Sequence, residues 1–76
     1  MPVIHLIDSI RILIYFDDHL PPHFHAQYNE FEILIEIDSL ETYSGYLPTK
    51  QSKRVFAWAK ENQNFLREKW TEFYDI

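Results

Sequence analysis

The sequence predicts one α+β domain over residues 1–76, in which an antiparallel sheet of about five short strands (a β-meander) precedes two C-terminal helices packed on one face. Two observations carry this prediction. Polar and apolar residues alternate through much of residues 1–47, a period typical of half-buried strands, whereas apolar residues recur every three to four positions in residues 48–76. A chain of this length has room for one core only, because it buries about 60% of the surface that its unfolded form exposes.

Turn residues bound the expected strands. Asp8-Ser9 separates the first strand from the second, and Asn29-Glu30 separates the third from the fourth. The last strand contains Gly45, the single glycine of the chain. Neighbouring strands joined by such short turns pair antiparallel. The five expected strands are residues 2–7, 10–16, 23–28, 31–38 and about 41–47.

Two consecutive helices are expected in residues 48–76. An Asn-Gln-Asn run interrupts the helical spacing, and Asn64, at the end of that run, is expected to cap a second helix over residues 65–74. Trp58 and Trp70 follow the apolar stripes of the two helices, so we expect them to anchor the helices on the sheet.

Composition excludes several kinds of protein. The chain has no cysteine, which removes disulfides, thiolate metal sites and cysteine nucleophiles, and which fits a reducing cytoplasm. No apolar stretch approaches the roughly 20 residues that span a bilayer, and the start lacks a leader pattern, so a soluble protein without membrane contact is expected. Glycine-rich phosphate loops and nucleophile elbows are also absent from the sequence.

Charge is distributed unevenly along the chain, whose net charge is −5. Residues 1–48 hold one basic and eight acidic residues, and residues 49–76 hold six basic and four acidic ones. The acidic part repels phosphate backbones, so nucleic-acid binding, which stays open, would need the C-terminal basic residues. A basic protein partner is equally compatible with this distribution, and the simplest interpretation of the C-terminal charges is a solvated helix face.

Residues 17–28 hold the residue types needed for proton transfer or metal binding. This stretch contains three of the four histidines, two aspartates and a double proline. If Asn29-Glu30 is a two-residue turn, His23 and His25 point to the same side of the sheet, roughly 6–7 Å apart, opposite to the core side. The side chain directly across from His23 is then Glu36, which would orient its ring. We expect these imidazoles to project together from the sheet face that the helices leave bare.

Three interpretations of this histidine cluster stay open. The histidines can be ordinary polar residues of a sheet face. They can divide the roles of general base and general acid, with His19, His23 and His25 as the candidate catalytic residues. They can also bind a divalent metal such as zinc or manganese, with His23, His25 and Asp18 as the candidate ligands. His5, alone on the first strand, is expected to be a structural residue.

Motifs along nearly the whole chain match those of a known family. The matching segments are Met1-Pro2-Val3-Ile4, Ile14-Tyr15-Phe16-Asp17-Asp18-His19, Pro21-Pro22-His23-Phe24-His25-Ala26-x-Tyr28, Ile35-x-Ile37-Asp38, Gly45-x-Leu47-Pro48, Trp58-Ala59 and Trp70. In these segments the chain resembles the bacterial family called domain of unknown function 4160. It departs from the family at Asn29-Glu30, where glycine is usual.

The resemblance implies a small cytoplasmic protein encoded beside another short protein, in a two-protein module of the toxin–antitoxin type. On this basis we expect a toxin-like component with a small protein partner and a histidine-rich site. The alternative is a non-catalytic protein-interaction or metal-binding module. Whether the chain is an enzyme, and whether it forms a homo-oligomer, are left open by the resemblance, and no substrate follows from it.

Overall fold

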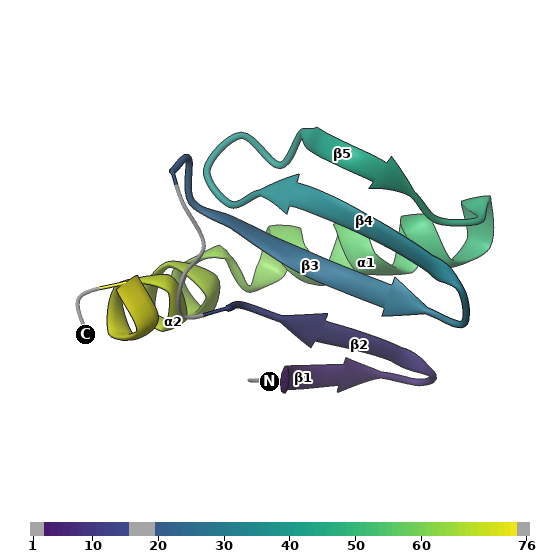
Figure 1. Cartoon of the computed structure of the whole chain (residues 1–76), viewed down its shortest axis with the longest axis horizontal. Coiled ribbons are helices and arrows are strands. Elements are labelled where there is room, and N and C mark those ends of the chain that lie inside the picture. Colours follow the sequence, from purple (N-terminus) through teal and green to yellow (C-terminus); the bar gives the residue numbers. More distant parts are fainter. Residues whose placement is uncertain (1–2, 16–19, 75–76) are drawn as a thin grey trace.

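The computed structural model describes residues 3–15 and 20–74, and it confirms the α+β fold. Five antiparallel strands form one sheet in the order β1-β2-β3-β4-β5, which is a meander, and two helices follow (Figure 1). Within the described residues, neither helix is long and apolar enough to cross a membrane. The elements are β1 (Val3–Ile7), β2 (Ile10–Leu13), β3 (His23–Tyr28), β4 (Phe31–Glu36), β5 (Thr42–Tyr46), α1 (Thr49–Glu61) and α2 (Gln63–Tyr74).

The β3–β4 hairpin has the register that the alternation predicts. Phe24 pairs with Ile35 and Ala26 pairs with Ile33, and all four side chains belong to the hydrophobic core. The turn works without glycine because Asn29 adopts a positive φ of 53°, which asparagine tolerates better than most residues. Side chains at the alternate positions of both strands therefore point away from the core.

Helix α1 lies against the core face of the sheet and runs behind β3 and β4 in the view of Figure 1. Val55 and Ala59 of α1 and Leu66 of α2 are fully buried in the same cluster as the apolar side chains of the sheet. Helix α2 lies near the end of the sheet where β3 begins, and its Trp70 is 6% exposed. Trp70 is therefore a core residue, as its position in the apolar stripe predicts.

The junction between the helices differs from the expected one. Asn64 lies inside α2, so the prediction that it caps this helix is wrong. The break falls at Asn62, whose side-chain amide donates to the carbonyl of Trp58 and whose own carbonyl accepts from the N–H of Leu66. Asn62 thus ends one helix and begins the next, because it satisfies backbone groups on both sides of the break.

Candidate functional site

His23 and His25 lie side by side on β3. Their ring centroids are 5.3 Å apart, and both occupy the alternate positions of the strand that face away from Phe24 and the main core. The structure therefore brings together two of the four residues that the sequence proposes for the site. The other two, Asp18 and His19, lie outside the described residues.

Both histidines are buried, which corrects the expectation that they project from a bare face. His23 is 2% exposed and His25 is 9% exposed. Helix α2 lies near the end of the sheet where β3 begins, and the ring of its Trp70 lies 5.5 Å from that of His23. The ring of Tyr43 on β5 lies 5.3 Å from that of His23. The rings of Tyr15 and His25 form a T-shaped pair, with 4.5 Å between their centroids. The imidazoles are thus enclosed by aromatic rings.

The orientation of His23 is set by the main chain. Its Nδ1 lies 2.8 Å from the carbonyl oxygen of Pro21. A carbonyl oxygen can only accept, so Nδ1 carries the proton, and in the neutral ring Nε2 is the acceptor nitrogen. Glu36 is directly across from His23, as predicted. However, the bond at Nδ1 goes to Pro21, and one oxygen of Glu36 accepts from the hydroxyl of Ser39 instead.

The orientation of His25 is set by a carboxylate. Its Nδ1 donates to Oε2 of Glu32 at 3.0 Å, and the same oxygen accepts from the Gln27 amide at 3.1 Å. Partial burial alone would raise the pKa of Glu32, but the hydrogen bonds from Gln27 and His25 and the charge of His25 outweigh it. The pKa of Glu32 therefore lies below its usual value of 4.5.

A polar network surrounds this histidine–carboxylate pair. Gln27 also donates to the hydroxyl of Tyr15 at 3.3 Å, and it accepts from Arg11 at 2.9 Å. Gln27 and Glu32 lie on the same face as the histidines, but the sequence-based prediction paired His23 with Glu36 and named no partner for His25. The signal was present, since Glu32 is the diagonal neighbour of His25 across the hairpin, a distance that a glutamate can span.

Metal-binding residues are sparse in the part of the chain that the structure describes. No group of three or more histidine, cysteine, aspartate or glutamate side chains there could hold a metal ion. His5 does not join the pair, because it stacks on Trp58 of α1 with 4.8 Å between ring centroids. Surface hollows of about 180 to 430 Å³ are lined by other residues, mainly of α1, α2 and β5.

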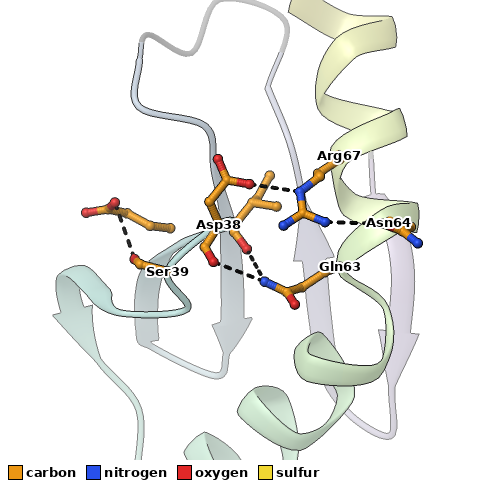
Figure 2. Close-up of polar contacts among 7 residues, drawn as sticks. Asp38, Ser39, Gln63, Asn64 and Arg67 are labelled. Atoms are coloured by element: carbon orange, nitrogen blue, oxygen red, sulfur yellow. Dashed lines mark hydrogen bonds and ion pairs between the residues drawn. The ribbon is translucent and has the colours of Figure 1, made fainter.

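A second set of polar contacts ties the β4–β5 connection to α2 (Figure 2). The Gln63 side chain donates to the carbonyls of Ile37 and Asp38 at 2.9 and 3.1 Å. Arg67 donates through Nε to the carboxylate of Asp38 at 2.8 Å and through Nη1 to Asn64 at 3.1 Å. These contacts join two parts of the chain that lie more than 20 residues apart in sequence.

Comparison with known proteins gives one match. The family model described as Domain of unknown function (DUF4160) matches residues 9–71, which is most of the chain and includes both histidines of the pair. No curated protein and no solved structure matches the chain. The matched region contains strands β2 to β5, the histidine pair, α1 and most of α2, and the chain belongs to the DUF4160 family.

Proposed function

We propose that this chain is the toxin-like component of a two-protein bacterial module of the toxin–antitoxin type, and that His23 and His25 form its proton-transfer site. His19 and Asp18, which precede the double proline, are proposed as further members of the site. The module is placed in the cytoplasm, and the partner is a small protein encoded nearby. Membership of the family and the arrangement of the two imidazoles support this proposal.

One observation carries the chemical part of the proposal. Each ring donates through Nδ1 to a fixed oxygen, that of Pro21 or that of Glu32. Nε2 is then the basic nitrogen of each neutral ring. The two neighbouring imidazoles are thus held in fixed orientations by different Nδ1 partners. One ring can accept a proton while the other supplies one.

The experiment that tests this function is regulated expression in a bacterial host. Wild type should arrest growth, and coexpression of the neighbouring gene's product should relieve the arrest and copurify with the chain. The His23→Ala, His25→Ala double variant should not arrest growth but should still bind the partner. His5→Ala, which changes a histidine outside the pair, is the matched control and should behave as wild type.

Two outcomes would count against this function. Normal growth during wild-type expression, with the protein verified as folded and soluble, would remove the toxin role. Arrest that persists in the double variant would remove His23 and His25 from the chemistry. A double variant that grows normally and also loses the partner points to a binding role for the pair rather than a catalytic one.

A second candidate function is divalent-metal binding by His23 and His25. Histidine ligands usually donate their other ring nitrogen to a carboxylate or a carbonyl, which both residues do here. A zinc ion held at tetrahedral angle by two Nε2 atoms, with Zn–N near 2.0–2.1 Å, requires ring centroids about 5.2 Å apart. The observed separation of 5.3 Å meets this requirement.

Calorimetry with zinc and with manganese on metal-free protein tests the metal candidate. We expect binding to wild type and to His5→Ala, and a loss of binding in His23→Ala and in His25→Ala. The absence of both heat and a thermal shift in the wild type would exclude this function. Binding that survives in both single variants would place the ion elsewhere on the chain.

A further inference from the structure

We infer that Gln63 and Arg67 of α2 are positioning residues for the His23 imidazole. The inference deepens the proposed function, on which its relevance to activity rests, because it names the part of the fold that holds one of the two proposed proton-transfer groups in place. Neither residue touches His23 in the contacts described above. They act through the connection between β4 and β5.

The first half of the route runs from α2 to this connection. Gln63 uses both hydrogen bonds of its amide nitrogen on main-chain carbonyls, those of Ile37 and Asp38. Arg67, one turn further along the helix, holds the side chain of Asp38 (Figure 2). The main chain of residues 37–38 is therefore fixed by two adjacent turns of one helix.

The second half of the route runs from the connection to the histidine. The N–H of Ile37 donates to the carbonyl of Pro22 at 3.0 Å, and the carbonyl of Pro21, the preceding residue, accepts from Nδ1 of His23. Each proline ring fixes φ and restricts the residue before it, so a displacement at Pro22 is transmitted to Pro21. The position of the oxygen that sets the tautomer of His23 thus depends on Ile37, and through it on α2.

The same helix also reaches His23 directly. Trp70 follows Arg67 by three residues and Gln63 by seven, which places all three on one side of the helix. The Trp70 ring lies 5.5 Å from the His23 ring. One side of α2 therefore packs against the His23 ring through Trp70. Through the separate polar route of Gln63 and Arg67, the same side also fixes the Pro21 carbonyl to which that ring donates.

The test compares two double variants that make identical chemical changes. Gln63→Glu with Arg67→Gln removes the amide donor and the ion pair from the route. Gln51→Glu with Arg54→Gln makes the same changes on α1, where Arg54 pairs with Asp8. The two ion pairs are matched in exposure, at 50% and 65% for Arg54 and Asp8 and at 47% and 66% for Arg67 and Asp38.

The readout is the tautomer of His23, followed by nitrogen-15 NMR of the imidazole ring at a pH where the ring is neutral. Loss of a typical neutral hydrogen bond corresponds to roughly fivefold in an equilibrium constant. We therefore expect the ratio of Nδ1-protonated to Nε2-protonated ring to fall about threefold to fivefold in the α2 variant. The ratio should be unchanged in the α1 control.

An unchanged ratio in the folded α2 variant, or an equal fall in both variants, would overturn the inference. Should the α2 double variant unfold, the tautomer ratio of His23 is measured in the single variants Arg67→Gln and Arg54→Gln instead. Equal ratios in these two variants would also overturn the inference. The ratio does not depend on growth arrest. A wild type that fails to arrest growth while the ratio responds as expected would remove the proposed function and leave the positioning role intact.

Discussion

Gly45 is the position where a single methyl group should do the most damage to the sheet. Its φ is +86°, in the region that favours glycine, and a Cβ built there would collide with the carbonyl oxygen of Glu32. Outside that carbonyl group, the nearest atom would be Cα of Ile33, at 3.1 Å. Both obstacles are backbone atoms of β4, which cannot rotate away, so Gly45→Ala must displace one strand from the other.

The cost of Gly45→Ala can be worked from these two effects. Positive φ costs a non-glycine residue about 1–2 kcal/mol. Displacing a paired strand against a backbone clash adds roughly 1–3 kcal/mol, as overpacking does in cores. The total of about 2–5 kcal/mol is a large share of the stability expected for a 76-residue chain, about 4–11 kcal/mol at typical per-residue values.

Urea denaturation followed by tryptophan fluorescence measures this cost, with Ser44→Ala as the control. Ser44 is the exposed neighbour of Gly45 in β5, and its substitution should change the free energy of unfolding by less than about 0.5 kcal/mol. A Gly45→Ala protein as stable as Ser44→Ala would refute the reasoning. Because the clash falls on Glu32, the variant should also weaken the hydrogen bond that His25 donates to Glu32, which NMR of the imidazole would detect.

Three further predictions concern the core, the helix junction and pH. Leu66→Ala, at a fully buried position, should lower the free energy of unfolding in urea by about 2–5 kcal/mol. Leu20→Ala, at a 57% exposed position, should lower it by less than about 0.5 kcal/mol, and similar losses in the two variants would contradict the core assignment. Asn62→Ala should lower the free energy of unfolding by about 0.5–2 kcal/mol, and a smaller loss would mean that the junction does not depend on the side chain of Asn62. The pKa of Glu32 is lower in the folded state, so the ionised side chain contributes to stability above pH 4.5, and this contribution is lost as the pH falls through the pKa of the folded state. The difference in free energy of unfolding between wild type and Glu32→Gln should therefore shrink on acidification, and a constant difference would contradict this.

The sheet could be predicted because its information is local. Alternation and a two-residue turn at Asn29-Glu30 fix which residues face each other in the β3–β4 hairpin, and the observed pairs, from His23 with Glu36 to Tyr28 with Phe31, are those that the sequence predicts. The change of period after Pro48 located both helices, and only their junction was misplaced, by two residues. In each case the deciding interactions lie within a few residues of one another.

The surroundings of the histidines could not be predicted in the same way. Trp70 is 47 residues from His23 in sequence, and its approach depends on where α2 lies relative to the end of the sheet. Tyr43 reaches the same ring from β5, at a point where the β4–β5 pairing is irregular. Periodicity alone predicts on which face of the sheet a side chain lies, but not which other elements cover that face. The sequence therefore predicted an exposed face at His23 and His25, whereas both side chains are buried in the structure.

Enclosure places both imidazoles where water cannot satisfy their ring nitrogens. In a chain with so small a core, a residue that only filled the space between Trp70 and Tyr43 could be apolar, which would avoid the cost of burying imidazole nitrogens. His23 and His25 bear that cost, and each Nδ1 is matched to an oxygen whose position depends on several other residues. Such an arrangement holds each ring in one direction. Packing does not need that constraint, but proton transfer and metal binding do.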